Sequence, residues 1–185
     1  MGKKIWKIIS WILLILTVLS MILMFIPPSG MNAASDPAAA QSFDSKLERL
    51  EDAHRRGEPA EVRLTEVEVN SKFQQIFAGA PSSGLVAASG LTIQIKQDRL
   101  SCVLKIKVLA APLFITLGGK PGVRAGRLDF ELTDVDLGRM PAPASVISAA
   151  LRDKLRSPEG EEMTTLPEYI AAIEVENGEL VIQSR

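Results

Sequence analysis

The sequence contains one cysteine, Cys102, and one histidine, His54, among its 185 residues. A single cysteine cannot form an intramolecular disulfide, so apolar burial has to stabilise the fold. A zinc site needs several histidine or cysteine ligands, and the chain has too few. A catalytic triad or Cys–His pair would need His54, which lies far in sequence from the carboxylate-rich segments. We expect a non-enzymatic protein with no catalytic residues, metal or cofactor.

The chain also lacks a basic stripe. Its 21 basic and 22 acidic residues give a net charge of −1. Lys3, Lys4 and Lys7 are the only charges before Asp36, so the remainder is more acidic than the whole. This balance argues against a nucleic-acid partner, and also against strong adhesion to anionic lipid.

One long apolar run is present. Ile8 to Ile26 carry no charge, and as a helix this run would reach about 28 Å, close to the hydrocarbon thickness of a bilayer. The lysines before it predict a cytoplasmic N-terminus and an extracytoplasmic main domain, either periplasmic or at the cell surface. We therefore interpret residues 1–28 as a transmembrane signal anchor, which makes the bilayer the first partner.

The alternative for this segment is a cleaved signal peptide. Such peptides have a hydrophobic region of about 7–15 residues and a small-x-small cleavage site. The present run is longer, and a cut after Ala34 would place Asn32 at the −3 position. The lone Cys102 lies far from the run, so a lipoprotein anchor is not expected. The pattern favours an uncleaved anchor.

Residues 29–58 are predicted to form a juxtamembrane tether and helix. Residues 29–35 are small and flexible in character, and Asp36-Pro37 is typical of a helix start. The helix is expected to end before Gly57. Its apolar stripe is thin, which favours a strap packed on the domain over a short dimerising coiled coil. The stripe consists of Phe43, Leu47, Leu50 and Ala53.

Residues 59–185 are predicted to form the main domain. It opens with a short strand, 61–64, followed by a capping box in which Thr65 is the N-cap and Glu68 reaches back. The next helix places apolar residues at i, i+4, i+7 and i+8 on one face. They are Val69, Phe73, Ile76 and Phe77, and a loop over 82–90 follows.

Beyond this loop the apolar period changes to two, which is typical of strands. Apolar and polar residues alternate on both sides of Asp98-Arg99. A two-residue turn there would form an antiparallel hairpin with both apolar sets on one face. The predicted pairs are Ile95 with Cys102 and Ile93 with Leu104.

Two more strands are predicted over 112–117 and 123–137, separated by a turn at the glycine-rich segment 118–122. The apolar alternation in the second strand slips by one residue near its end. An extra residue near Thr133-Asp134 would restore it, so we predict a β-bulge there.

A second amphipathic helix is predicted over 146–155, ended by Ser157-Pro158. An exposed acidic loop over 159–164 and a single helical turn over 165–169 should follow. The chain then closes with Asn177-Gly178 between alternating runs, a strong hairpin signal. The predicted pairs are Val175 with Leu180 and Ile173 with Ile182.

This order predicts an α+β fold, a curved antiparallel sheet wrapped around one or two amphipathic helices. Such a sheet could enclose an apolar groove that binds a ligand, or its apolar residues could fill a core. The membrane location makes lipid the available ligand. The predicted lining is Phe73, Phe77, Ile93, Leu104, Ile106, Ile115, Phe130, Leu132, Ile147 and Leu151.

The acidic residues of the long strand are the remaining chemical candidates. Asp129 and Glu131 would share one face about 7 Å apart, a spacing that could hold calcium or support acid–base chemistry. Asp134 and Asp136 follow them. The neighbouring Arg127 favours a solvated outer face instead.

Three segments resemble a known group of proteins. "VRLTEVEVN" at 62–70, "DVDLGRMPAPASVI" at 134–147 and "IEVENGELVI" at 173–182 are similar to motifs of small bacterial envelope proteins of the YpmS and YceB types. The resemblance covers residues 60–185. It implies a tubular lipid-binding (TULIP-like) fold, in which a curved sheet wraps a helix and lipid lies in the groove. It implies no catalytic residues.

Two functions follow as hypotheses. The first is a non-catalytic, membrane-anchored extracytoplasmic domain that binds lipid or another apolar ligand. The second is a structural or assembly partner in a cell-envelope protein complex, which would use residues 36–56 and the sheet edges as contacts.

Overall fold

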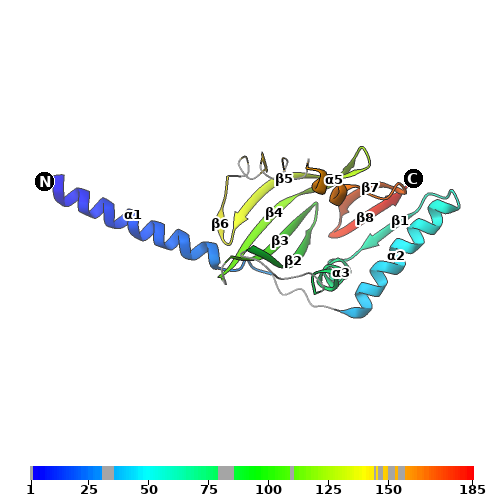
Figure 1. Cartoon of the computed structure of the whole chain (residues 1–185), viewed down its shortest axis with the longest axis horizontal. Coiled ribbons are helices and arrows are strands. Elements are labelled where there is room, and N and C mark those ends of the chain that lie inside the picture. The colour runs from blue at the N-terminus through cyan, green and yellow to red at the C-terminus, as the bar shows by residue number, and fades with distance from the viewer. Residues whose placement is uncertain are drawn as a thin grey trace.

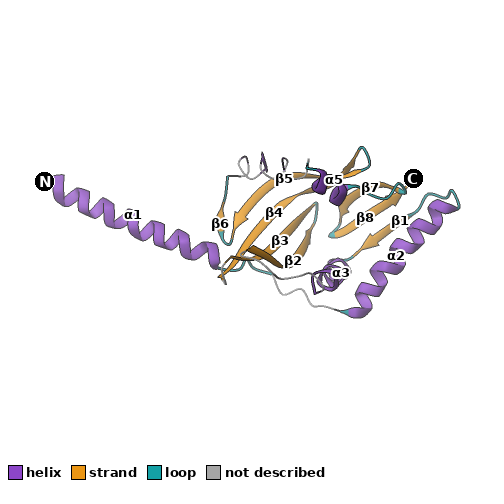
Figure 2. Cartoon of the chain, in the orientation of Figure 1, coloured by secondary structure: helices purple, strands orange, loops and turns teal. Residues whose placement is uncertain are grey.

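The computed structural model describes residues 2–30, 36–78, 86–108, 111–143, 145, 148–149, 153 and 157–185. Within them the fold is α+β, as predicted, but the strands divide into two antiparallel sheets rather than one (Figure 2). The sheet orders are β1-β8-β7 and β2-β3-β4-β5-β6. The elements are α1 (Gly2–Phe25), α2 (Pro37–Arg55), β1 (Glu61–Leu64), α3 (Glu66–Ala78), β2 (Val86–Lys96), β3 (Arg99–Val108), β4 (Ala111–Arg124), β5 (Arg127–Leu137), β6 (Met140–Pro141), α5 (Pro158–Thr164), β7 (Ile170–Glu176) and β8 (Glu179–Ser184).

Helix α1 extends away from the two sheets (Figure 1). Its described side chains run from Ile9 to Phe25, and the large apolar ones among them that face solvent are 43% to 65% exposed. Among the described residues, no helix meets the length and apolarity required for a bilayer crossing.

The end of α1 is fastened to the turn between β5 and β6. The Arg139 N–H donates to the Leu23 carbonyl at 3.0 Å, and the Arg139 Nε–H donates to the Pro27 carbonyl at 3.2 Å. Gly138 lies directly against backbone carbonyls of the last turn of α1, where a Cβ atom would not fit. Its φ of +63° also disfavours other residues.

The chain then crosses the five-stranded sheet from β5 to β2. The Gln94 side-chain amide donates to the Ser29 carbonyl at 2.9 Å. The face that it crosses carries Gln94, Val103 and Phe114 and is called the outer face below. Val103 and Phe114 are buried on it. We call Leu23–Gly30 the strap; the remainder of the predicted tether, 31–35, lies outside the described residues.

Helix α2 packs on the domain through its apolar stripe. Asp36 caps it as predicted, accepting from the Ala38 N–H at 2.9 Å. Leu50 and Ala53 are buried, and Leu50 belongs to the main hydrophobic core. The helix contacts α3, β1 and β8, so its apolar face is used within the chain.

A polar network joins α2 to α3 at the predicted capping box. Glu68 accepts from the Thr65 N–H at 2.8 Å, from the Ser42 hydroxyl and from Lys46 Nζ, which lies 2.7 Å away. Burial by itself raises the pKa of Glu68, but these hydrogen bonds outweigh it and lower the pKa to about 2.

Helix α3 protects the edge of the five-stranded sheet. Strand β2 is an edge strand, and the fully buried Asn70 amide replaces a neighbouring strand there. Its Oδ1 accepts from the Ile93 N–H at 2.7 Å, and its Nδ2 donates to the Ile93 carbonyl at 2.6 Å. Glu66 accepts from the Ile95 N–H at 2.8 Å. Covered edges cannot recruit a foreign strand.

The β2–β3 hairpin forms with a different turn from the predicted one. Lys96 pairs with Arg99, so the turn is at 97–98 and not at Asp98-Arg99. The observed pairs shift by two residues, which keeps the apolar sets on one face. They are Ile95 with Leu100 and Ile93 with Cys102. Strand β2 also begins at Val86, within the predicted loop.

Strand β4 continues through the glycine-rich segment 118–122, which was predicted to be a turn. Gly118 and Gly119 are buried under the side chains of β5, and Asp134 and Phe130 occupy the space that a Cβ atom would need. The turn occurs later, at Ala125-Gly126, where both φ angles are positive. The predicted bulge is confirmed, because the register skips the residue between 132 and 134.

The predictions for the C-terminal region have mixed outcomes. The Asn177-Gly178 hairpin has the predicted pairs. Ser157 and Pro158 begin helix α5 as N-cap and first residue, so the predicted loop at 159–164 is helical. No helical turn forms at 165–169, where the described backbone is extended or a turn. Most of the predicted helix 146–155 lies outside the described residues.

The core lies where the two sheets and the helices α2 and α3 meet. Its buried members come from β1, β2, β3, β7 and β8 as well as from the two helices. This places the core in the part of the domain away from α1 (Figure 1). They are Leu50, Val62, Leu64, Val69, Ile93, Leu100, Ile170, Ile173 and Ile182.

Candidate functional site

The candidate site is the apolar face of the five-stranded sheet, opposite the outer face, which we call the inner face. Side chains of period two on four adjacent strands fall into rows across the sheet, because the antiparallel register aligns them. The rows are Ile93–Cys102–Leu117–Val135, Leu91–Leu104–Ile115–Leu137 and Ile106–Leu113.

Burial along this face is uneven. At the end away from α1, Ile93 and Leu100 are buried in the core. Towards α1, five of the described apolar side chains on this face are only half-buried and lie outside the core cluster. We call them the open half of the inner face. They are Leu104, Ile106, Leu113, Ile115 and Leu137.

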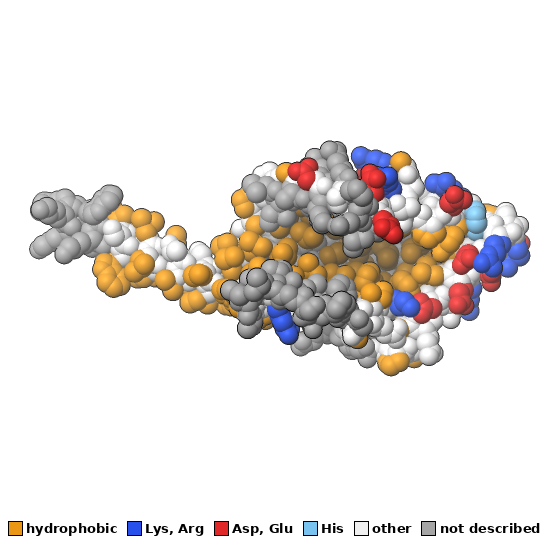
Figure 3. All heavy atoms as spheres, viewed as in Figure 1, with side chains coloured by type: hydrophobic (Ala, Val, Ile, Leu, Met, Phe, Trp, Pro, Cys, Tyr) orange, Lys and Arg blue, Asp and Glu red, His pale blue; other side chains and the backbone are white. Residues whose placement is uncertain are grey.

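Figure 3 shows hydrophobic side chains gathered in a hollowed band over the five-stranded sheet. The band continues towards the hydrophobic surface of α1, while charged side chains collect at the opposite end of the domain. Contiguous exposed apolar surface on a protein marks an interaction site for a ligand, a partner or a membrane.

The predicted lining residues are distributed between this face and the core. Leu104, Ile106 and Ile115 belong to the open half. Ile93 is buried in the core, and Phe73 and Phe130 are partly buried and pack against it. Leu132 is half-buried on the inner face, opposite Gly119. The side chains of Phe77, Ile147 and Leu151 lie outside the described residues.

Two residues of the open half, Leu113 and Leu137, were missing from the predicted lining. Both follow the same period-two alternation that identified Ile115 and Leu132. Both residues lie within the strands predicted over 112–117 and 123–137, so the alternation alone was a sufficient signal. The register adds that Leu137 lies in the same row as Leu104 and Ile115.

Cys102 lies on the inner face, between Ile93 and Leu117 in its row. It is partly buried and packs against the core. Burial raises the pKa of its thiol to about 11. A protonated thiol is a poor nucleophile, so this residue acts as a small apolar side chain.

The acidic candidates of β5 face outward. Asp129 lies 3.2 Å from Arg124, and Asp134 lies 3.6 Å from Arg99. Among the residues that the structure describes, no three histidine, cysteine, aspartate or glutamate side chains are grouped as a metal site requires. The predicted shared face of Asp129 and Glu131 is confirmed by the register.

His54 is half-buried beside Tyr169, with ring centroids 6.1 Å apart, and its Nδ1 lies 3.3 Å from the Arg185 carbonyl. It joins the end of α2 to the C-terminal residue. Burial raises the pKa of Tyr169, and the charge of Glu51 adds to that effect. These contacts give His54 a structural position.

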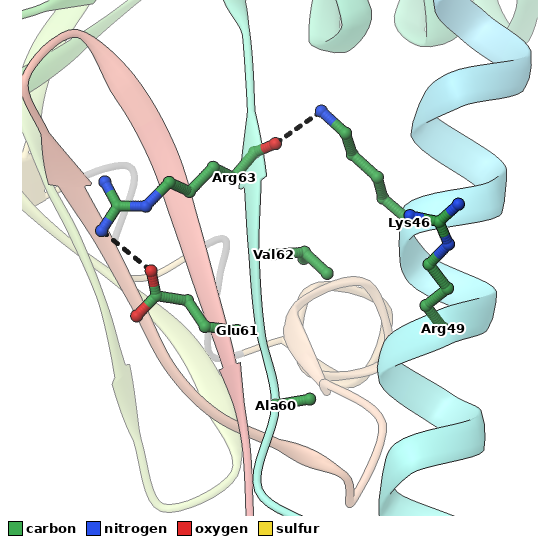
Figure 4. Close-up of a pocket in the computed structure, with 6 residues that line it drawn as sticks. All are labelled: Lys46, Arg49, Ala60, Glu61, Val62 and Arg63. Carbon is green, nitrogen blue, oxygen red and sulfur yellow. Dashed lines mark hydrogen bonds and ion pairs between the residues drawn. The ribbon is translucent and has the colours of Figure 1, made fainter.

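A second concavity lies between α2 and β1. It encloses about 420 Å³ and is lined by Lys46, Arg49, Ala60, Glu61, Val62 and Arg63. Figure 4 shows Lys46 reaching the Arg63 carbonyl, at 2.7 Å, and the Arg63 guanidinium turned towards Glu61. Two of its three cations are therefore used within the chain, and Lys46 satisfies one backbone carbonyl at the free edge of β1.

Comparison with known proteins gives no assignment: no protein-family model matches the chain, and no curated protein matches its sequence.

Proposed function

We propose that this protein is a membrane-anchored, extracytoplasmic domain that binds lipid or another apolar ligand on the inner face of its five-stranded sheet. The observation that carries the proposal is the open half, an apolar surface beside the end of α1 whose side chains are only half-buried. In this proposal Ile8–Ile26 cross the bilayer, with Lys3, Lys4 and Lys7 on the cytoplasmic side.

The ligand would lie on the curved sheet, with the apolar chain of a lipid along the rows of the open half. Each methylene that leaves water contributes about 0.8 kcal/mol, so a chain that buries even half its length would bind appreciably. The resemblance to envelope proteins of the YpmS and YceB types agrees with this function. Non-catalytic binding also agrees with the protonated Cys102 and with the ion-paired Asp129 and Asp134.

The alternative, an assembly partner in an envelope complex, has less support. It was expected to use residues 36–56 and the sheet edges. Leu50 and Ala53 of α2 are buried within the chain, and Asn70 and Lys46 satisfy backbone groups at the edges of β2 and β1. The apolar stripe of α2 and parts of these two edges are already used, so we favour ligand binding.

Native mass spectrometry of the full chain, extracted from membranes in a mild detergent, tests the proposal. We expect adducts with the mass of a lipid. A double variant, Leu104→Gln with Ile115→Gln, places polar groups at two facing positions of the open half and should lose the adducts. The matched control, Val67→Gln with Leu128→Gln, changes two apolar residues that are 47% and 39% exposed elsewhere.

The control variant should retain the adducts. Circular dichroism should give the same spectrum for both double variants, because none of the four residues belongs to the buried core. A lipid-free mass for the wild-type protein, or equal adduct loss in both variants, would overturn the proposal.

A further inference from the structure

The charges of the five-stranded sheet are sorted along its length. At the end away from α1, four of its five basic residues are paired with acidic ones, and among the described residues only Lys96 there has no ion pair. The pairs are Arg99 with Asp98 and Asp134, Lys120 with Asp98, Arg124 with Asp129 and Arg127 with Glu161, at 2.8 to 3.7 Å. This end is electrically balanced, as expected for a solvated surface.

The end beside α1 differs. Lys105 pairs across the sheet with Phe114, whose carbonyl accepts from the Gly138 N–H at 2.7 Å, and Gly138 contacts the last turn of α1. Lys107 lies one step further along the same face of β3, and Arg139 follows Gly138. We call Lys105, Lys107 and Arg139 the basic rim.

The basic rim has no ion-pair partner within the described part of the chain. Lys107 and Arg139 are exposed, and Lys105 is half-buried. Asp136 is the one acidic residue described in this half of the sheet, and it lies further from α1 than Lys105 does by register. Three cations and one anion therefore occupy the end where α1 joins the domain.

We propose that the basic rim binds the anionic headgroups of the leaflet from which α1 emerges. This inference rests on the proposed anchoring by α1. The strap fixes the end of α1 to Gly138 and Arg139, so it brings the rim to headgroup level without a flexible linker. The opposite charges of the basic rim and the leaflet attract each other. This attraction would hold the open half of the inner face next to the lipid.

The overall negative charge predicted weak attraction to anionic lipid. The sorted charges change that expectation, because attraction falls off within a Debye length of about 8–10 Å and only nearby charges act. Each basic residue near an anionic surface favours contact roughly fivefold. Two lysines would therefore give about a 25-fold preference.

The test uses the full chain in lipid nanodiscs that contain traces of quencher-labelled lipid. A fluorophore is placed at Ala111→Cys, an exposed position at the start of β4, in a Cys102→Ala background. Quenching is compared for phosphatidylglycerol and phosphatidylcholine that carry the same quencher. We expect a preference for phosphatidylglycerol of fivefold or more, which 1 M NaCl abolishes.

The variant Lys105→Glu with Lys107→Glu should lose the preference, and Lys105→Gln with Lys107→Gln should lose most of it. The control, Lys96→Glu with Lys120→Glu, changes the net charge equally at the far end of the sheet and should retain it. The proposal would be overturned if the Lys105/Lys107 variant and the Lys96/Lys120 control showed the same lipid preference, or if the protein with its native lysines showed none. The proposal would also be overturned if 10 mM inorganic phosphate removed the lipid preference while a phosphate-free buffer of the same ionic strength did not.

Failure of the proposed anchoring would look different. A chain that does not enter nanodiscs, as judged by gel filtration, would contradict the membrane anchor itself. A chain that enters them but shows no lipid preference would contradict only the basic rim.

Discussion

Replacing Glu68 with glutamine should destabilise the protein by about 3 kcal/mol at pH 7 and by much less near pH 2. The pKa of Glu68 falls from 4.5 to about 2 on folding. Since one pH unit corresponds to about 1.4 kcal/mol, the ionised carboxylate contributes about 3 kcal/mol. The Glu68 side chain is 9% exposed, so solvent screens its contact with Lys46 little.

The sign follows from the direction of the pKa shift. A carboxyl group with a lower pKa in the folded state stabilises the fold above its unfolded pKa, and this contribution is lost as pH falls towards the folded value. The difference in free energy of unfolding between wild type and Glu68→Gln should therefore disappear as the pH falls from about 5 to about 2.

The assay is urea unfolding of the full chain in detergent, followed by far-ultraviolet circular dichroism from pH 7 to pH 2. Other carboxyl groups also titrate in this range, so the informative quantity is the difference between variants at each pH. The control is Glu51→Gln, which removes an exposed i,i+4 pair with Arg55 and should cost about 0.5 kcal/mol or less. A stability difference between wild type and Glu68→Gln that stays constant with pH, or the absence of a difference at pH 7, would refute this account of the Glu68 network.

Two further predictions concern the sheet. Asn70→Leu should lower the free energy of unfolding by about 2–5 kcal/mol, because it leaves both backbone groups of Ile93 unpaired in a buried site. Asn70→Asp keeps an acceptor for the Ile93 N–H but loses the donor to the Ile93 carbonyl, so it should also destabilise the fold, and an unchanged unfolding midpoint in the Leu variant would contradict the edge role. Leu50→Ala should cost about 2–5 kcal/mol, whereas Leu113→Ala should cost about 1 kcal/mol or less, because Leu113 is only half-buried and lies outside the core cluster. Urea unfolding measures both, and equal costs would mean that the open half is part of the core.

Local signals predicted the elements that depend on neighbouring residues. The capping box at Thr65, the Asn177-Gly178 hairpin and the β5 bulge all formed where the sequence indicated them. Each depends on a hydrogen bond or side-chain alternation within a few residues. Ser157-Pro158 is compatible with either the end or the start of a helix. The prediction that a loop follows it was wrong, because Ser157 is the N-cap of α5.

Long-range contacts explain the failures. Glycines at 118–119 usually indicate a turn, but here they accept the close approach of Asp134 and Phe130 from β5. The division into two sheets likewise depends on which strands meet in space. For the site, alternation predicted Leu104, Ile106 and Ile115 on one face. Only the packing of the helices and the second sheet against one end of that face shows that these three are half-buried while Ile93 is buried.

The position of the core explains how this fold can tolerate an open apolar face. Leu50, Val69 and Ile173 pack where α2, α3 and both sheets meet, away from α1, so the domain does not depend on filling the other half of the sheet. That half is held instead by the ladders of β3, β4 and β5, and by the strap that crosses its outer face. Stability and the candidate binding surface thus occupy different ends of one sheet, and a polar substitution in the open half should disturb binding before it disturbs folding.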